Sequence, residues 1–354
     1  MTNKTWNVGI IGLGAIGASH MNHLAKITNT KVAAICDVNA NAVEQVGDRL
    51  NLPPEKRYSD FQAIIADSEI DFIISGVSNK FHFDILKLAI EYGKPIFSEK
   101  PFTRTMEEAD ELVSLYEKNP IPCMIGFSYR YRPCFQYVKQ LVTNGTLGRI
   151  RHIAAHYLQE ENAPMFNKEY TWRFNKAMAG SGILADIGSH MVDAARFFVG
   201  EFTQVSGMMS TFTDRRMDKR TGEYAQVDVD DFTGFQCVLE GGVMGSFYTH
   251  KNAIGTRNQF DVTLFGDLGT VRISVERPNE VHLTLRAGEN LQLTETVIHL
   301  DEKSVKPMLQ DFVDYLEQRK STSVPTIMDG YRNQQVLQAI IDSSEDGVTR
   351  SLSF

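Results

Sequence analysis

The chain has 354 residues, of which 23% are charged and 42% hydrophobic, so it is long enough for two domains that each bury a core. Its formal net charge of -8 lacks the excess of basic groups that nucleic-acid-binding proteins carry, so nucleic acid is not expected as a partner. No apolar run approaches the roughly 20 residues of a membrane helix, and no export signal precedes the first strand pattern. We therefore expect a cytoplasmic protein without a membrane partner.

The first predicted elements are a strand at Val8–Ile11 and a helix that continues through Ile27, with glycines between them in GxGxxG spacing. A second strand pattern, "KVAAICDVN", ends at Asp37, 20 residues after Gly17. Such glycines permit a tight turn, a close approach of the backbone to a pyrophosphate, and close packing of the helix. The segment predicts a dinucleotide site formed by Gly12, Gly14, Ala15, Ile16, Gly17 and Asp37.

An acidic side chain at the tip of the second strand suits the ribose hydroxyls and repels a 2'-phosphate, so Asp37 favours NAD over NADP. Strand and helix patterns then alternate, with strands expected at 71–76 and 95–98, which predicts a parallel, doubly wound sheet. Ligands bind such sheets at the carboxyl ends of the strands. By position, the following residues are expected to face the cofactor: Ser78, Asn79, His82, Glu99 and Lys100.

The periodicity changes at about residue 127, where long strands punctuated by glycine turns begin. We expect an α/β Rossmann domain at 1–126 and an α+β domain at 127–354 with a large, open, mainly antiparallel sheet. Two helical patterns at about 306–320 and 329–343 are expected to pack back on the body, in part on the first domain. Apolar residues on both faces of two strands predict a homodimer or homotetramer formed through this sheet.

The stretch "GILADIGSHMVDAARFF" places Asp186 and His190 four residues apart at the start of a predicted helix. This spacing puts both side chains on one helix face, where they can reach the same small volume. The pair is either an acid/base set or a capped helix that carries an ordinary histidine. Asp193 is a rival partner for the imidazole, although an ion pair with Arg196 explains it as well.

Three motifs in this order, "GLGAIG", "EKP" and "GILADIGSHMVD", resemble the glucose-fructose oxidoreductase, inositol dehydrogenase and MocA family of nicotinamide-dependent sugar and cyclitol oxidoreductases. The resemblance spans essentially the whole chain. It implies that Lys100 contacts the reacting oxygen, that Asp186 is a helper carboxylate and that His190 is the acid/base. It also implies an open antiparallel sheet that frequently forms the subunit interface. The chain departs from the family's Thr-Pro-Asn loop, since it has Val77, Ser78 and Asn79 there.

Two segments are candidates for substrate contacts, because they combine aromatic rings with hydrogen-bond donors suited to a polyol. The first, "GFSYRYRP", leaves the dinucleotide-binding sheet, and the second, "YTWRFNKAMAGSG", leads directly into the predicted catalytic helix. Packing and surface ion pairs are the alternative explanation for these residues, and the arginines would also suit a carboxylate or phosphate. The candidates are Tyr129, Arg130, Tyr157, Trp172, Arg173 and Asn175, together with Asp186 and His190.

These patterns predict an NAD-dependent oxidoreductase that transfers hydride between nicotinamide and a secondary alcohol carbon of a sugar or inositol-like cyclitol. His190 would accept the hydroxyl proton and Lys100 would stabilise the developing alkoxide. Asp186 would orient the imidazole or bind an adjacent hydroxyl. Two alternatives remain: an NAD-dependent glycosidase that oxidises its substrate transiently, and a sugar- or NAD-sensing regulator without catalysis.

No metal site is expected. His20 and His23 have no third ligand nearby, so one packed and one exposed histidine is the simpler interpretation. Four cysteines without a Cys-x-x-Cys pair lie in or beside hydrophobic stretches and are expected to be reduced and buried. They are Cys36, Cys123, Cys134 and Cys237.

Overall fold

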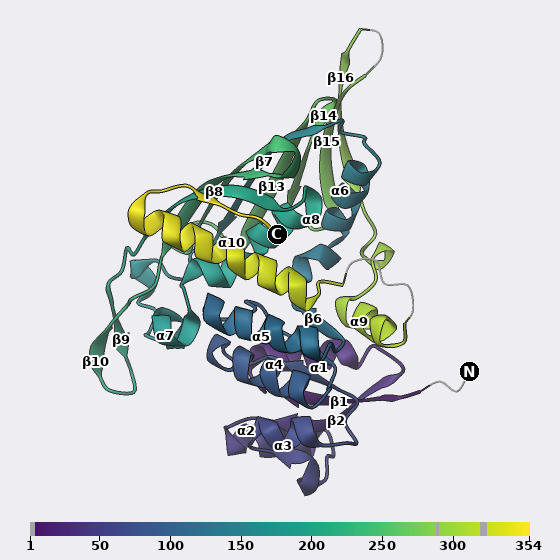
Figure 1. Cartoon of the computed structure of the whole chain (residues 1–354), viewed down its shortest axis with the longest axis vertical. Coiled ribbons are helices and arrows are strands. Elements are labelled where there is room, and N and C mark those ends of the chain that lie inside the picture. The colour runs from purple at the N-terminus through teal and green to yellow at the C-terminus, as the bar shows by residue number, and fades with distance from the viewer. Residues whose placement is uncertain (1–3, 288–289, 319–323) are drawn as a thin grey trace. The chain divides into compact units, whose positions relative to one another are not determined.

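The computed structural model describes residues 4–287, 290–318 and 324–354, which divide into two compact units (Figure 1). The first unit comprises residues 4–126 with the C-terminal segment 307–331, and the second comprises the remainder. Three positions of the predicted first domain (1–3) and two of the predicted helix at 306–320 (319–320) lie outside the described residues.

The first unit is built on a parallel sheet with the strand order β3-β2-β1-β4-β5-β6. Its central strands are buried on both faces, as in β4, because helices cover both sides of such a sheet. The predicted Rossmann fold is confirmed. The strands are β1 (Trp6–Ile11), β2 (Thr30–Cys36), β3 (Arg57–Tyr58), β4 (Phe72–Ser75), β5 (Ile96–Ser98) and β6 (Cys123–Ile125). The helices are α1 (Ala15–Leu24), α2 (Ala40–Arg49), α3 (Phe61–Ala66), α4 (His82–Glu91), α5 (Met106–Lys118) and α9 (Met308–Leu316).

Helix α9 comes late in the chain but belongs to the core of the first unit. The ring of Phe312 packs edge-on against Phe72 at 5.5 Å and against Phe97 at 6.2 Å between ring centroids. Trp6 Nε1 also donates a hydrogen bond of 3.1 Å to Glu317, directly after this helix. Aromatic contacts of this kind supply much of a core's packing energy. The long helix α10 (Ile327–Asp346) then begins in the first unit and continues into the second.

The second unit is built on a large sheet with the strand order β16-β15-β14-β13-β7-β12-β11-β8-β17. Within the described residues of this sheet, neighbouring strands run antiparallel except for β7 and β12, which are parallel, so the sheet is mainly antiparallel as predicted. The strands are β7 (Ile150–Leu158), β8 (Phe202–Ser210), β11 (Phe232–Leu239), β12 (Val243–His250), β13 (Gln259–Gly266), β14 (Gly269–Ser274), β15 (Glu280–Ala287), β16 (Gln292–His299) and β17 (Arg350–Ser351).

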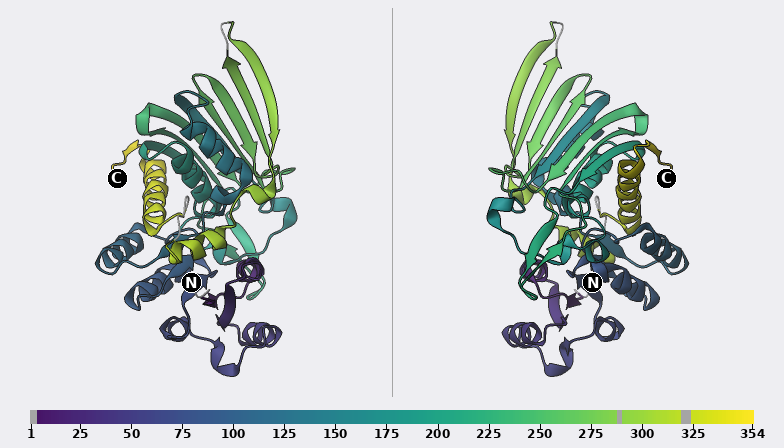
Figure 2. Two further views of the ribbon diagram at one scale, coloured as in Figure 1. Left: turned by 90° about the vertical axis from the view of Figure 1, so that its right-hand side faces the viewer. Right: turned by 90° about the vertical axis from the view of Figure 1, so that its left-hand side faces the viewer.

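Helices α6 (Pro133–Thr143) and α8 (Ser189–Phe198) cover one face of this sheet (Figure 2). Side chains alternate along β12 between this buried face and the opposite, more exposed one. Beneath the helices, Phe135 packs against Phe198 and Phe260 at 5.3 and 5.7 Å between ring centroids. The core of the second unit therefore lies on the helical side, and the other face of the sheet is left uncovered within the unit.

Several elements of the second unit were not expected from the sequence. They include helix α6, the short helix α7 (Lys176–Ala179), the hairpin of β9 (Arg215–Asp218) and β10 (Glu223–Gln226), and strands β16 and β17. Within the described ranges, no helix has the length and hydrophobicity needed to cross a membrane. The four cysteines are free and buried, as predicted, and burial raises the pKa of each thiol to about 12.

Candidate functional site

The glycine-rich turn after β1 is shaped by close backbone contacts. Gly12 has a φ of +90°, and a Cβ at this position would come within 2.6 Å of the Gly76 carbonyl oxygen. A Cβ at Gly17 would lie only 1.9 Å from the Gly12 carbonyl oxygen. A Cβ at Gly14 would meet no atom within 4 Å, so open space lies above the start of α1. Gly12 and Gly17 are thus needed for close packing, and Gly14 leaves room for a ligand to approach the backbone.

A hollow of about 260 Å³ adjoins this turn and is lined by Gly12, Gly14, Asp37, Val38 and Ser78, among other residues. The Asp37 carboxylate accepts hydrogen bonds of 2.8 Å from the backbone N–H groups of Leu13 and Asn39, which fixes it at the edge of the hollow. Val38 is 84% exposed and offers an apolar surface there. The open helix start, the fixed carboxylate and the apolar wall fit the pyrophosphate, ribose and adenine of a dinucleotide.

Three of the predicted cofactor residues lie on the first turns of helices. Ala15 and Ile16 begin α1, and the Ile16 side chain is 47% exposed. Asn79 is buried at the start of a short helical turn that precedes α4.

His82 does not line the hollow that Asp37 and Ser78 share. It is buried, with Nδ1 2.7 Å from the Pro101 carbonyl oxygen and Nε2 3.3 Å from the Val77 carbonyl oxygen. Burial lowers the pKa of this imidazole, so it is neutral and donates one ring proton. His82 therefore ties together the loops after β4 and β5.

The "EKP" motif follows β5, where Glu99 and Lys100 are partly buried. Glu99 Oε1 lies 2.9 Å from Nε2 of the buried His20. A Cβ at Gly126 would come within 3.0 Å of the Glu99 carboxyl carbon. His23 is exposed, so the expected pattern of one packed and one exposed histidine is confirmed. Among the described residues, no group of three His, Cys, Asp or Glu side chains is arranged to hold a metal ion.

In the second unit, Asp186 and His190 occupy the predicted helical segment, but its first part is wider than an α-helix. Leu184–Gly188 forms a π-helical turn that leads directly into α8. Such turns are rare and are frequent at functional sites. The segment begins on the buried carboxylate of Asp230, which accepts hydrogen bonds from the backbone N–H groups of Gly182 at 2.6 Å and Leu184 at 2.9 Å. Asp230 thus caps the helix that carries both predicted catalytic residues.

The imidazole of His190 is 8% exposed and is enclosed by aromatic rings. Its centroid lies 4.6 Å from that of Tyr129 and 6.4 Å from that of Tyr157. The two tyrosine hydroxyls are 2.6 Å apart, and Tyr157 donates a hydrogen bond of 2.7 Å to Asn258 Oδ1. Burial and the neighbouring Tyr129 raise the pKa of Tyr157, so its hydroxyl stays protonated. The tyrosines predicted from the sequence therefore lie beside the predicted base.

The carboxylate of Asp186 has a partner that the sequence did not reveal. Its Oδ2 accepts a hydrogen bond of 2.5 Å from Nζ of Lys251, which is buried directly after β12. The same ammonium lies 2.9 Å from Glu161 Oε1, in the loop after β7. The carboxyl ends of β7 and β12 lie side by side because these strands are parallel. The contact between Lys251 and Asp186 was not predictable from the sequence, because it depends on this pairing of strands.

The remaining predicted substrate residues take different positions. Arg130 forms a buried ion pair with both carboxylate oxygens of Asp193, at 2.9 Å from Nε to Oδ2. Arg196 pairs with Glu201 at 2.7 Å. These pairs favour a role for Arg130 in fixing α8.

The segment before α7 carries three further candidates. Arg173 is exposed and stacks over the Trp172 ring at 4.5 Å. The Asn175 side chain accepts a hydrogen bond of 3.1 Å from the Met178 backbone N–H and so caps α7.

Comparisons with known proteins match both units to one family. Residues 6–127 match an oxidoreductase family with an NAD-binding Rossmann fold, and residues 135–272 match the GFO/IDH/MocA C-terminal domain. The levoglucosan dehydrogenase of Pseudarthrobacter phenanthrenivorans is 31% identical over 303 residues, covering 80% of this chain and 77% of that protein. The D-glucoside 3-dehydrogenase of Escherichia coli is 25% identical and covers 98% and 97%.

A solved structure of levoglucosan dehydrogenase in complex with NADH and L-sorbose aligns with a TM-score of 0.92 at 28% identity, covering 99% of both chains. The myo-inositol 2-dehydrogenase of Thermotoga maritima is 25% identical and covers 80% of this chain and 79% of that protein. The chain therefore belongs to the GFO/IDH/MocA family and is an NAD-binding oxidoreductase of the sugar dehydrogenase type.

Proposed function

We propose that this chain oxidises a secondary alcohol carbon of a sugar or cyclitol with NAD, using Lys100, Asp186 and His190 as its catalytic set. The observation that carries the proposal is the tyrosine-lined position of His190 one turn after Asp186, in a chain whose other unit has an NAD-binding fold. An imidazole has a reference pKa near 6.5 and can accept a hydroxyl proton close to neutral pH.

The first unit supplies the cofactor site in this proposal. Gly12, Gly14 and Gly17 hold the turn under the pyrophosphate, and Asp37 receives the ribose hydroxyls. Bound NAD supplies a hydride acceptor. The position after Asp37 is Val38 and carries no positive charge for a 2'-phosphate, which supports NAD over NADP. Ser78, Asn79, Glu99 and the start of α1 complete the proposed contacts.

The chemistry of the alcohol is assigned to three side chains. His190 accepts the proton of the reacting hydroxyl, and the Lys100 ammonium orients the same oxygen and stabilises its developing negative charge. Asp186 stays ionised beside Lys251 and either orients the imidazole or receives a neighbouring hydroxyl. Fixing the carbinol carbon in position contributes a further large part of the rate.

For the substrate, we propose a neutral sugar ring, as in the related levoglucosan dehydrogenase and D-glucoside 3-dehydrogenase. The rings of Tyr129 and Tyr157 supply apolar surface for ring carbons, and Trp172, Arg173 and Asn175 are the proposed outer contacts. Arg130 is assigned to holding α8, since its guanidinium is paired with Asp193.

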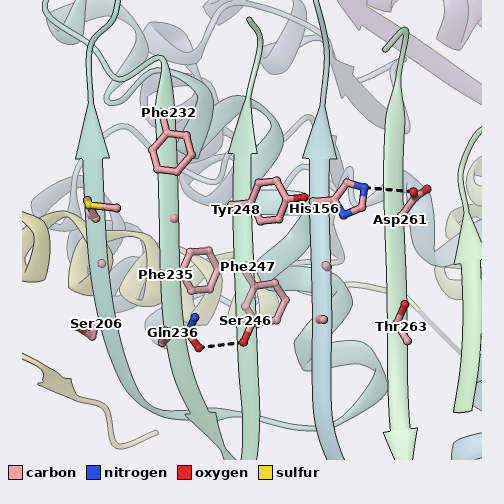
Figure 3. Close-up of a pocket in the computed structure, with 15 residues that line it drawn as sticks. His156, Ser206, Phe232, Phe235, Gln236, Ser246, Phe247, Tyr248, Asp261 and Thr263 are labelled. Atoms are coloured by element: carbon pink, nitrogen blue, oxygen red, sulfur yellow. Dashed lines mark hydrogen bonds and ion pairs between the residues drawn. The ribbon is translucent and has the colours of Figure 1, made fainter. Parts of the chain in front are cut away.

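We also propose that a second copy of this chain covers the open face of the large sheet. A hollow of about 520 Å³ lies on this face and is lined by small residues and by residues with aromatic rings. Figure 3 shows three of its rings, those of Phe232, Tyr248 and His156, on neighbouring strands. Met208, Met244 and Tyr248 are 65%, 50% and 43% exposed, which is a large apolar exposure for a sheet centre. A face of this kind pairs readily with its own symmetry mate.

The direct test of the proposed function is a screen of levoglucosan, hexoses, pentoses, inositols and uronic acids with NAD and with NADP, in which reduced cofactor is followed by its absorbance. The proposal predicts net reduction of NAD with at least one neutral sugar or cyclitol. A regulator would bind a ligand without reducing NAD, and a glycosidase would release an aglycone without net reduction.

A further inference from the structure

The catalytic segment of the second unit contains a buried lysine that is separate from the "EKP" motif. The Lys251 side chain is 7% exposed, and its ammonium bridges Asp186 and Glu161 at 2.5 and 2.9 Å. Burial alone lowers the pKa of an amine, but Asp186 and Glu161 more than offset this effect, so the pKa of Lys251 is raised. The side chain is therefore a permanent cation near the predicted base.

We infer that Lys251 is a positioning residue of the reaction, which holds Asp186 as an oriented, ionised carboxylate that binds a substrate hydroxyl and does not itself take up the proton. This inference rests on the proposed function. It chooses between the two roles left open for Asp186, because an anion paired with an ammonium is a poor proton acceptor and a good acceptor of a hydrogen bond.

The backbone around Lys251 is fixed, which lets the ammonium act as an orienting group. The Lys251 carbonyl accepts a hydrogen bond of 2.8 Å from Asn162 N–H, and the His250 carbonyl accepts one of 3.1 Å from Gln159 N–H. These bonds continue the parallel pairing of β7 and β12 past the ends of both strands. The ammonium is thus carried on the frame of the sheet, while Asp186 lies on the π-helical turn.

The charged groups around Asp186 have opposite signs. Glu161 contacts two ammonium groups, that of Lys251 and that of Lys168, whose Nζ lies 3.1 Å from Glu161 Oε1. Burial raises the pKa of Glu161, but the two ammonium groups more than offset this effect, so its pKa is lowered. In the described part of the second unit, the titratable groups that act on this cluster include Tyr157 from β7, Glu161 and Lys168 from the loop after β7, Arg173 from the segment before α7, and Lys251 after β12. His190 from α8 contacts the Tyr157 ring.

The test is the pH profile of kcat/KM for K251M and K251R with the sugar that the screen identifies. Loss of the Lys251 cation favours the protonated forms of the groups around it, so we expect the acid limb of kcat/KM to move to higher pH in K251M. K251R retains the charge and is expected to keep the wild-type limb. K168M is the matched control, because Lys168 shares Glu161 and its side chain is 28% exposed.

An acid limb of K251M that coincides with that of the wild type would overturn the inference. A limb that moves equally in K168M would also overturn it, because the effect would then come from general surface charge. Since Lys251 acts on the sugar side, the affinity for NADH, measured by fluorescence titration, is expected to stay unchanged in all three variants.

A second measurement does not depend on activity and so separates this inference from the proposed function. Thermal unfolding of wild type, K251M, D186N and K251M/D186N gives a double-mutant cycle. We expect K251M to lower the Tm less in the D186N background than in the wild type, and the double variant to fold even where K251M alone does not. Additive effects would show that the two groups do not interact and would refute the inference, whatever the enzyme oxidises.

Discussion

At the scale of single residues, His190 and Lys100 differ from the other candidates because the proposed reaction requires a function from each. The imidazole of His190 is largely buried and lies beside the rings of Tyr129 and Tyr157. We expect H190A to lower kcat by about 100- to 10,000-fold, the usual contribution of general acid-base assistance. K100M is expected to cause a similar loss.

Both variants should retain NADH binding, as measured by fluorescence titration, because neither change removes the glycine-rich turn. Near-normal turnover in either one would remove that residue from the catalytic set.

Asp37 is the residue on which cofactor choice is expected to depend. Its carboxylate is held by two backbone N–H groups at the edge of the hollow next to the glycine-rich turn. We expect D37A to lower kcat/KM for NAD about tenfold or more and to raise the NADP-to-NAD ratio, since a 2'-phosphate is no longer repelled. D37N is the control, because it removes the charge but keeps a side-chain oxygen that accepts the hydrogen bond from Leu13 N–H. It therefore separates the effect of the charge from an effect on the structure of the loop. An unchanged ratio in D37A would mean that the ribose is read by other groups.

Residues were predictable from the sequence where a motif fixes their place along one element. Gly12, Gly14 and Asp37 lie as their spacing indicates. Lys251 and the partner of Arg130 were not predictable, because both depend on contacts between segments far apart in the sequence. An arginine in the stretch "GFSYRYRP" is compatible with a substrate contact or with an ion pair, and for Arg130 only the position of Asp193 distinguishes them.

At the scale of elements, the helical segment 184–198 is held at its N-terminal end by the buried carboxylate of Asp230. Asp230 accepts two backbone hydrogen bonds and one from Thr233, while burial raises the pKa of its carboxyl. An amide replaces one acceptor by a donor that faces an N–H group. We expect D230N to lose about 1–3 kcal/mol of stability and to lower kcat, because the turn that carries Asp186 begins there.

Thermal unfolding and initial rates check this prediction. D228N is the control, since Asp228 lies in the same loop, is exposed and caps only α7 through Lys176 N–H. Equal effects of the two variants would argue against a special role for the buried cap.

The hydrophobic pattern predicted most of the long strands of both units, but it did not predict which strands pair with each other. Strands β10 and β16 are largely exposed, and the buried side chains of β9 are the polar Arg216 and Asp218. These strands therefore lack the alternation of apolar and polar residues that marks a half-buried strand. The parallel pairing of β7 with β12 was missed because periodicity identifies a strand and not its neighbour. The π-helical turn was read as part of a regular helix, since it adds one residue to a turn without changing the composition.

At the scale of the whole molecule, the order of motifs along the chain was sufficient to predict the family and the Rossmann fold followed by a large sheet. The late segment with α9 was harder to assign, because its apolar face fits either core, and Phe312 packs in the first unit.

The open face of the large sheet leads to a prediction about assembly. We expect Y248E to reduce the proportion of oligomer, since Tyr248 is partly exposed at the hollow on that face and a buried charge there is costly. Analytical ultracentrifugation of Y248E and of the wild type would measure the proportion of oligomer in each. Y224E is the control, because Tyr224 is 65% exposed on the β9–β10 hairpin. If both variants and the wild type sediment alike, the open face is not the contact between copies.

The central claim is that hydride leaves a carbinol carbon of the substrate and remains on the nicotinamide at the end of each turnover. The most direct measurement uses a sugar deuterated at its ring carbons and follows the label by mass spectrometry in both cofactor and sugar product. The account predicts one deuterium in each NADH formed and an equal amount of keto sugar. Retention of every deuterium in the sugar product, without net formation of NADH, would contradict it.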